Sequence, residues 1–346
     1  MKILILKPSS LGDVIQALPV LRLLKLHYPR SEIYWWIEAS LVSLLKSDPD
    51  LTGLFAFERK RWSSPLKWNE LFRSVREMRR HKFDLVIDLQ GLARSGAFAW
   101  LANGNTLVGV GDPREGAPGF YDVSVPRASY GTHAVDWYLS VLKQLNIPVD
   151  RPYEWLPVND YAKAIVDQQR ARHERYILIN PGARWMNKRW PAEHFAALVK
   201  NLAAEYPDFG FVITGAGNES AVAESIEAAA PERCINVAGR TSLVEMVEWI
   251  RGCSVMVTND TGPMHLAAAL GKTVLALFGP TEAARTGPYG QSHNVLRTSI
   301  PCAPCMKNRC SNPNYLECLR SITPEFVQEQ IRLRLKNAGA EAVHAE

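Results

Sequence analysis

Four residues in the second half of the chain, Asn259-Asp260-Thr261-Gly262, have the types that bind phosphate. They follow an apolar segment expected to be a strand, and a helix of small residues is expected to begin at Pro263. Asp260 or Thr261 can cap that helix, and Gly262 lets a ligand approach the backbone closely. Amide hydrogens and the positive end of the helix dipole would then face the carboxyl edge of a parallel sheet, which suits a phosphate. The alternative is an ordinary capped helix in a βαβ unit.

A single acid, Asp13, stands where the first helix is expected to begin. It lies in the segment Lys7-Pro-Ser-Ser-Leu-Gly-Asp13, directly after a buried first strand, and so at the carboxyl edge of the first sheet. A carboxylate that projects into a cleft between domains is well placed as a general base. The alternative is a helix cap worth roughly 1 kcal/mol, although Ser9 and Ser10 can also cap this helix.

A second turn suited to phosphate lies between Asn180 and Pro191. Arg184, Lys188 and Arg189 crowd this short loop, where positive charges repel one another unless an anion joins them. A diphosphate would satisfy Lys188 and the helix amides together. The alternative is a basic surface loop.

The segment Thr214–Ser220 resembles a dinucleotide-binding glycine turn only weakly. The next expected strand ends without the acid that the ribose of a nicotinamide cofactor requires. We therefore expect no such cofactor, and Glu219 can instead bind a ribose or sugar hydroxyl.

Four cysteines, at positions 302, 305, 310 and 318, lie close together in the sequence. In a cytosolic chain such thiols suggest structural zinc before they suggest disulfides, although the spacing does not match a standard zinc site. A reduced or partly oxidised loop is the alternative. No cluster of His, Asp and Glu typical of a catalytic metal occurs, so no metal is expected in the reaction.

Positive charge is concentrated between Arg59 and Lys82. This stretch holds nine Lys or Arg against two acids, a local charge of +7, whereas the whole chain carries +5. Such a patch suits an anionic partner such as phosphorylated lipid headgroups or an acidic sugar. A solvated helix face is the alternative for Arg73–Lys82. No usual nucleic-acid motif is present, so we expect no nucleic-acid partner.

Alternating strands and helices must position these residues in both halves of the chain. The stretch 147–157 contains several prolines and reads as a linker, and two doubly wound α/β domains facing each other across a cleft are expected. Strands are expected at 2–7, 32–37, 54–57, 83–88, 106–110, 176–180, 210–214, 234–237, 254–258 and 273–278. Helices are expected near 14–28, 66–81, 92–102, 132–145, 192–205, 219–229, 242–251, from 263, and at 324–336.

Composition agrees with a cytoplasmic globular enzyme. The 346 residues allow two domains of ordinary size, with 47% hydrophobic and 22% charged residues. No apolar run reaches the roughly 18 residues of a membrane span, and the N-terminus reads as a buried strand rather than a signal segment.

Taken together, several of these segments resemble the bacterial ADP-heptose:lipopolysaccharide heptosyltransferases, the family-nine glycosyltransferases of GT-B fold. The resemblance covers almost the whole chain. It rests on Lys7–Pro19, Asp88–Leu92 with Arg94-Ser95, Lys188–Pro191, Asp260–His265 and Phe278–Thr281.

The resemblance implies an acceptor-binding domain at 1–158 and an ADP-heptose-binding domain at 172–322. A helix at 323–338 would follow, with the first domain as one possible surface for it to pack on. Asp13 is then the catalytic base. The implied donor-binding residues are Arg184, Lys188, Glu219, Thr241, Asp260, Thr261, Gly262 and His265. The implied acceptor-binding residues are Ser10, Lys60, Arg61, Gln90, Arg94, Arg114 and His133.

The implied activity is inverting transfer of L-glycero-D-manno-heptose to the Kdo-lipid A inner core. Arg61-Trp62 and the segment Arg114–Val135 resemble the enzyme type that adds the first heptose. The cysteine segment 302–318 resembles the type that adds the second heptose to an already heptosylated core. Rival interpretations are a nucleotide-sugar epimerase and a non-catalytic binding protein on the same scaffold.

We also expect a location at the membrane. The basic region Arg59–Lys82, with Trp62 and Trp68, would face the acidic acceptor and the anionic cytoplasmic face of the inner membrane as a peripheral protein.

Overall fold

The computed structural model describes residues 1–62, 64–112 and 115–343. The chain divides into two compact units, Met1–Pro157 and Val158–Glu346. Each unit has its own sheet and its own core.

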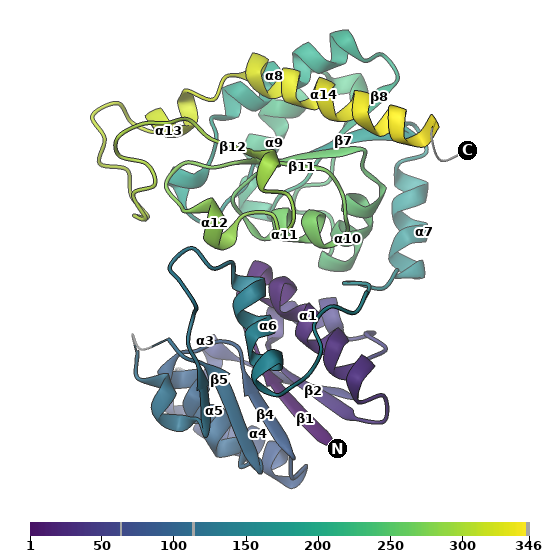
Figure 1. Cartoon of the computed structure of the whole chain (residues 1–346). Helices are drawn as coiled ribbons and strands as arrows, with labels where there is room; N and C mark the ends of the chain where they lie inside the picture. The colour runs from purple at the N-terminus through teal and green to yellow at the C-terminus, as the bar shows by residue number, and fades with distance from the viewer. Residues whose placement is uncertain (63, 113–114, 344–346) are drawn as a thin grey trace. The chain divides into compact units, whose positions relative to one another are not determined.

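The first unit is built, within the described residues, on a six-stranded parallel sheet in the order β3-β2-β1-β4-β5-β6 (Figure 1). The central strand β1 pairs with β2 and β4, so that Leu6 lies opposite Trp36 on one side and Asp88 on the other. Both faces of β1 are covered, which explains its unbroken apolar sequence. The strands are β1 Lys2–Leu6, β2 Glu32–Glu38, β3 Gly53–Phe57, β4 Leu85–Asp88, β5 Thr106–Val110 and β6 Val123–Val125.

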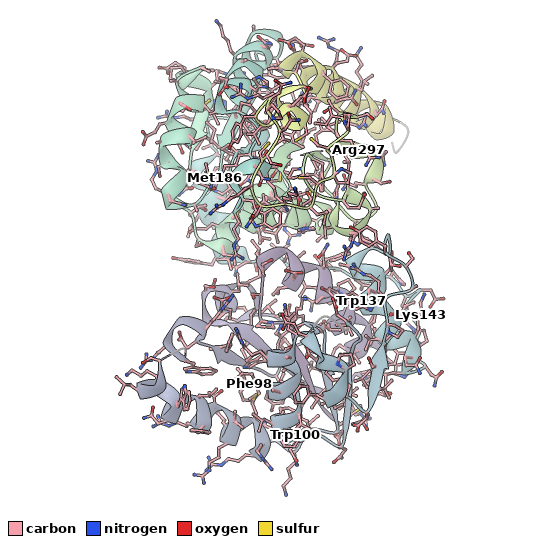
Figure 2. All side chains as sticks on the ribbon, turned by 90° about the vertical axis from the view of Figure 1, so that its left-hand side faces the viewer. Phe98, Trp100, Trp137, Lys143, Met186 and Arg297 are labelled. Atoms are coloured by element: carbon pink, nitrogen blue, oxygen red, sulfur yellow. The ribbon has the colours of Figure 1, made fainter. Side chains whose placement is uncertain are left out.

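Helices cover this sheet on both faces. On one face α1 packs beside α6 (Figure 1). On the other face α4 and α5 cover an aromatic core, in which the Phe98 and Trp36 ring centroids are 4.7 Å apart. Phe98 is 9% exposed, whereas Trp100, on another side of α5, is 62% exposed (Figure 2). The helices are α1 Leu11–His27, α2 Val42–Leu45, α3 Arg59–Trp62, α4 Trp68–Arg80, α5 Ala93–Ala102 and α6 Ala134–Gln144.

The second unit repeats the design on another six-stranded parallel sheet of the described chain, ordered β12-β11-β10-β7-β8-β9. Its strands are β7 Arg175–Asn180, β8 Phe209–Ile213, β9 Cys234–Asn236, β10 Val255–Asn259, β11 Val274–Leu277 and β12 Val295–Leu296. Its helices are α7 Asp160–Gln169, α8 Ala192–Glu205, α9 Ser220–Glu227, α10 Leu243–Gly252, α11 Gly262–Ala269, α12 Ala283–Thr286, α13 Glu317–Arg320 and α14 Pro324–Val343.

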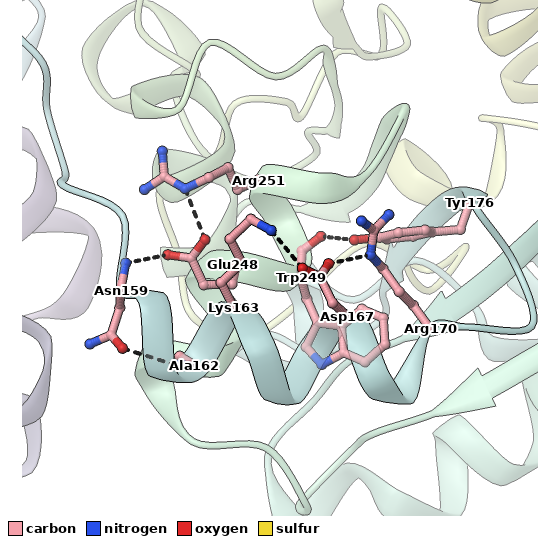
Figure 3. Close-up of polar contacts among 9 residues, drawn as sticks. All are labelled: Asn159, Ala162, Lys163, Asp167, Arg170, Tyr176, Glu248, Trp249 and Arg251. Atoms are coloured by element: carbon pink, nitrogen blue, oxygen red, sulfur yellow. Dashed lines mark hydrogen bonds and ion pairs between the residues drawn. The ribbon is translucent and has the colours of Figure 1, made fainter.

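Helix α7 opens the second unit and is anchored to α10. The Asn159 side chain caps α7 by accepting from the Ala162 amide at 3.0 Å, while the Asn159 amide donates to Glu248 at 3.1 Å (Figure 3). Glu248 also pairs with Arg251 at 3.0 Å. The sequence analysis did not predict α7.

The C-terminal helix α14 packs on α8. Val327 and Ile331 are buried in the core of the second unit, and Arg332 binds Glu205 at the end of α8 at 2.7 Å. The apolar residues of this helix complete the core of the second unit. Its packing on the first domain stays a prediction.

The predicted alternation of strands and helices is confirmed in both units. The short strands β6 and β12 were not predicted, because two or three residues carry no periodic signal. Among the described residues, no helix combines the length and apolarity that crossing a bilayer requires.

Candidate active site

The candidate site of the first unit lies where β1 and β4 end. In this sheet the strand order reverses between β1 and β4, since β1 continues to β2 and β4 continues to β5. Ligands of open α/β sheets bind outside the carboxyl ends of strands at such a reversal. The loop from Lys7 to Ser10 and the turn after Asp88 both occupy this edge.

Asp13 is fixed in the first turn of α1. Its Oδ2 accepts from the amide of Ser10 at 2.9 Å and from the Ser10 hydroxyl at 2.6 Å. Its Oδ1 lies 3.8 Å from the Nζ of Lys7, and its side chain is 41% exposed. The structure thus brings Ser10, Asp13 and Lys7 together, and the sequence analysis assigned no role to the lysine; the catalytic role of Asp13 and the acceptor role of Ser10 stay predictions.

Lys7 is a buried cation beside this carboxylate. Its side chain is 3% exposed, its Nζ donates to the carbonyl of Leu89 at 3.0 Å, and it lies 4.8 Å from the ring centroid of Tyr138 on α6. Burial acts to lower the pKa of Lys7, but Tyr138 and Asp13 act in the opposite direction and the pKa is raised. Lys7 therefore stays protonated and keeps a positive charge next to Asp13.

Asp88 organises the neighbouring turn. Its Oδ1 accepts from the amide of Gln90 at 2.8 Å and its Oδ2 accepts from the hydroxyl of Tyr121 at 2.7 Å. Burial raises the pKa of Asp88, and these hydrogen bonds oppose that shift. The Oε1 of Gln90 is buried and has no hydrogen-bond partner in the described part of the chain. Gln90 therefore has an acceptor left over at this edge, in keeping with its predicted role.

The other predicted acceptor residues lie on α3, on α5 and before α6, or outside the described residues. His133 precedes α6, and its Nδ1 accepts from the amide of Val135 at 3.2 Å. Arg94 is exposed in the first turn of α5. Arg61 lies on α3 and pairs with Glu70 at 2.6 Å. Lys60 lies on the same helix, but its side chain is outside the described part, as is the whole of Arg114.

The candidate site of the second unit lies where β7 and β10 end, the reversal point of the second sheet. Asparagines close both strands and join the turns that follow. Asn259 accepts from the amide of Trp190 at 2.9 Å and donates to the carbonyl of Pro181 at 2.7 Å. Asn180 donates to the hydroxyl of Thr258 at 3.1 Å. These buried bonds fix the loop that carries Lys188 against the loop that carries Asp260.

Lys188 and Asp260 form an ion pair of 2.5 Å, with side chains 18% and 6% exposed. Asp260 also accepts from the hydroxyl of Thr281, beyond β11, at 2.5 Å. The predicted crowding of unbalanced cations in this loop is therefore wrong. Lys188 is paired with Asp260 and Arg189 with Glu219, because loops after other strands bring acids to the same edge, while Arg184 is exposed.

Glu219 is used inside the unit. It is 8% exposed, its Oε1 accepts from Arg189 at 3.0 Å, and its Oε2 accepts from the amide of Ala216 at 2.9 Å. A Cβ at Gly182 would lie only 2.1 Å from Oε2, so the turn after β7 depends on a glycine there. The nucleoside contact expected of Glu219 stays a prediction.

Thr261, Gly262 and His265 form the start of α11. Thr261 occupies the cap position, but neither its side chain nor that of Asp260 caps the helix, since Asp260 binds Lys188 and Thr281 instead. The expected side-chain cap is thus absent from this helix start. Thr241 lies elsewhere, before α10, where its hydroxyl donates to Glu245 at 3.3 Å.

The cysteine-rich segment contains free thiols. Burial raises the pKa of Cys318 to about 11, and the Cys310 sulfur accepts from the amide of Leu316 at 3.4 Å. No group of three His, Cys, Asp or Glu residues arranged to hold a metal occurs within the described residues.

Sequence reasoning assigned no role to Lys7, Asp88 or Tyr138. A lysine or aspartate that ends an apolar strand is a signal that could have identified the first two. Tyr138 gave no signal, because it lies in an ordinary helical pattern and its contact with Lys7 spans 131 positions.

Comparisons with known proteins identify the family of this chain. The family described as glycosyltransferase family 9 (heptosyltransferase) matches residues 71–316. Lipopolysaccharide heptosyltransferase 1 of Pseudomonas aeruginosa is 32% identical over 337 residues, covering 90% of this chain and 88% of that protein. The structure of E. coli ADP-heptose lipopolysaccharide heptosyltransferase II is 26% identical with a TM-score of 0.78, covering 98% of this chain and 100% of that one.

A further solved structure shares the fold. E. coli heptosyltransferase WaaC with ADP-2-deoxy-2-fluoro heptose has a TM-score of 0.74 over 96% of this chain and 99% of its own, at 24% identity. The predicted fold class, two doubly wound α/β domains of GT-B type, is therefore confirmed, as is the prediction of a transferase. This chain belongs to glycosyltransferase family 9, the heptosyltransferases.

Proposed function

We propose that this protein transfers L-glycero-D-manno-heptose from ADP-heptose to the Kdo-lipid A inner core of lipopolysaccharide, with inversion at the anomeric carbon. Support comes from the names of its relatives, heptosyltransferases of the first and second type, and from the ADP-heptose analogue bound in the WaaC structure. The first unit is proposed to bind the acceptor and the second to bind the donor.

The single observation that carries this proposal is the setting of Asp13. Its carboxylate is partly exposed at the carboxyl edge of β1, held on one oxygen by Ser10 and facing the Lys7 ammonium with the other. A carboxylate used only as a cap needs no buried cation beside it. In the proposed reaction Asp13 takes the proton of the acceptor hydroxyl, as the acceptor oxygen forms its bond to the anomeric carbon.

The bond that breaks joins the anomeric carbon to the diphosphate of ADP. Negative charge grows on that diphosphate in the transition state, and a well-placed donor can contribute about 3–4 kcal/mol there. Lys188 and the amides at the start of α11 are the proposed donors, with Arg184 beside them. Asp260 repels an anion itself, so its proposed role is to hold Lys188 and to bind hydroxyl groups of the sugar with His265.

The test is mass spectrometry of the product formed from ADP-heptose with two acceptors, a Kdo-terminated core and a core that already carries one heptose. We expect a mass increase of one heptose on the Kdo-terminated core. Exclusive reaction of the heptosylated core would assign the second-heptose activity instead, which the cysteine segment favours. Release of free sugar without any acceptor would support the epimerase interpretation and overturn the transferase.

We further propose that the protein attaches peripherally to the anionic cytoplasmic face of the inner membrane. The basic stretch Arg59–Lys82 supports this attachment, since anionic lipids attract clustered Lys and Arg. Binding to acidic vesicles should weaken as ionic strength rises. Equal binding at low and high salt would contradict an electrostatic attachment.

A further inference from the structure

We propose that one side of α4, together with the short turn Pro65–Lys67 before it, is a membrane-insertion surface, in which apolar side chains enter the headgroup layer of an anionic bilayer beside four phosphate-binding arginines. The insertion surface consists of Leu66, Trp68 and Phe72 together with Arg73, Arg76, Arg79 and Arg80. The inference deepens the proposed peripheral attachment and rests on it. Electrostatic attraction alone requires only the arginines.

The apolar members of this surface are exposed. Leu66 is 88% exposed, Trp68 50% and Phe72 65%. They do not belong to the side of α4 that holds the helix on its unit, which is formed by Val75 and Met78 in the aromatic core. Side chains of this size left in water mark a surface that binds something apolar.

Helical spacing brings the apolar and cationic members together. Trp68, Phe72 and Arg76 follow at four-residue intervals, so they line one side of the helix. Phe72 and the four arginines line a single groove of about 930 Å³. Asn69 and Val75 also line this groove, so apolar and cationic side chains share it, while Leu66 and Trp68 lie next to it in the sequence.

The arginines of this groove form no salt bridge within the described residues, although Glu77 lies on the same helix. Arg73, Arg76, Arg79 and Arg80 form no ion pair with any described residue, although neighbours three or four apart repel one another. Glu70, an acid of the same helix, is already paired with Arg61 at 2.6 Å and Lys67 at 3.6 Å. An external anion would relieve this repulsion.

A bilayer surface can bind the arginines and the apolar side chains of the insertion surface at once. Phosphates of anionic lipids bind arginine, and the boundary between headgroups and acyl chains accepts Trp, Phe and Leu. Nucleic acid would satisfy the arginines and stack on Trp68, but it offers nothing to Leu66, the most exposed of the three. A free phosphate would leave all three apolar side chains in water.

Two components of binding follow from this chemistry. The arginine component is screened by salt, and the insertion component is not. Wild-type protein should therefore bind vesicles of phosphatidylethanolamine and phosphatidylglycerol strongly at low salt. It should keep measurable binding in about 0.5 M KCl, where salt screens most of the electrostatic attraction.

The experiment is vesicle co-sedimentation of full-length variants. Trp68→Ser/Phe72→Ser should remove the salt-resistant binding and lower affinity about tenfold or more at low salt. Arg76→Gln/Arg80→Gln should lower low-salt affinity roughly tenfold and spare the salt-resistant part. Tyr161→Ser, at a site 79% exposed on α7, and Lys143→Gln/Arg297→Gln, at exposed positions labelled in Figure 2, are matched controls and should bind as wild type.

The proposal is overturned if Trp68→Ser/Phe72→Ser binds as wild type at both salt concentrations. It is also overturned if the wild-type protein does not bind vesicles but binds duplex DNA through the same arginines. All of these variants should unfold at the wild-type urea concentration, which shows that they fold, and the wild-type protein should transfer heptose to a delipidated, soluble acceptor. Absence of that transfer in the wild type would overturn the proposed function and leave the vesicle result standing.

Discussion

The carboxylate of Asp13 receives two hydrogen bonds from Ser10 and faces Lys7, so its position does not depend on a substrate. Asparagine at this position has the same size and can accept the same bonds through Oδ1, but it cannot take up a proton. We expect Asp13→Asn to reduce heptosyl transfer at least a hundredfold, within the range of general-base contributions. ADP affinity and the free energy of unfolding should change little.

Steady-state transfer rates, ADP calorimetry and chemical unfolding together check this expectation. Ser10→Ala is the control, because it removes the hydroxyl bond to Asp13 while it keeps the amide bond and the base, and so should cost less than Asp13→Asn. A wild-type rate in Asp13→Asn would reduce this residue to a helix cap.

At the scale of elements, the turn after β7 contacts the turn after β8 where Gly182 lies against the side chain of Glu219. A methyl group at Gly182 would lie 2.1 Å from the Glu219 carboxylate, which Arg189 and Ala216 hold in place. We expect Gly182→Ala to lower the free energy of unfolding by about 1–3 kcal/mol, as overpacking of a tight site does. Urea unfolding is the measurement.

The double variant Gly182→Ala/Glu219→Ala tests the cause. Removal of the carboxylate makes room for the methyl group, so the double variant should be more stable than the sum of the two single effects predicts. Strict additivity would show that the cost of Gly182→Ala has another origin.

The contact between α14 and α8 makes stability depend on pH. Hydrogen bonds from Arg332 lower the pKa of Glu205 to about 2, below its ordinary value of 4.5. This stabilisation is complete above pH 4.5 and is lost as the pH falls towards 2. Because both side chains are partly exposed, we expect Glu205→Gln to cost about 1 kcal/mol or less at pH 7.

Unfolding free energies of wild type and Glu205→Gln should therefore converge between pH 4.5 and pH 2. Glu329→Gln, which removes the other carboxylate paired with Arg332 on α14, is a control and should have the smaller effect at pH 7. A difference that persists unchanged at pH 2 would contradict the assigned origin.

The elements themselves were largely predictable, and the pairings of their side chains were not. Mostly apolar runs such as 254–258 and the alternation with helices predict the sheets, because strands covered on both faces lack a regular alternation of apolar and polar positions. The positions of Asp13 and Lys188 in the loops after strands were predictable as well. The partners of Lys188 and Arg189 were not, because Asp260 and Glu219 lie 72 and 30 positions away and no local pattern encodes such contacts.

At the scale of the whole molecule, each unit has a core of its own, and the proposed donor residues lie in only one of them. The first core includes Trp36 and Phe98, and the second includes Trp190 and Phe195. We therefore expect calorimetric unfolding to show two transitions. ADP at one hundred times its Kd should stabilise the donor-binding unit by about 2.7 kcal/mol and raise the temperature of only one transition.

Lys188→Ala identifies that transition. It removes a cation from the proposed diphosphate site and leaves the Asp260 carboxylate, 6% exposed, without its lysine. The transition that responds to ADP should therefore be lower in the absence of ligand and should respond less to ADP, while the other transition stays in place. Lys188→Arg, which keeps the charge, should recover part of the response. If ADP raises both transition temperatures, and does so by the same amount in Lys188→Ala as in the wild type, the diphosphate is bound elsewhere. The assignment of the donor to the second unit then fails.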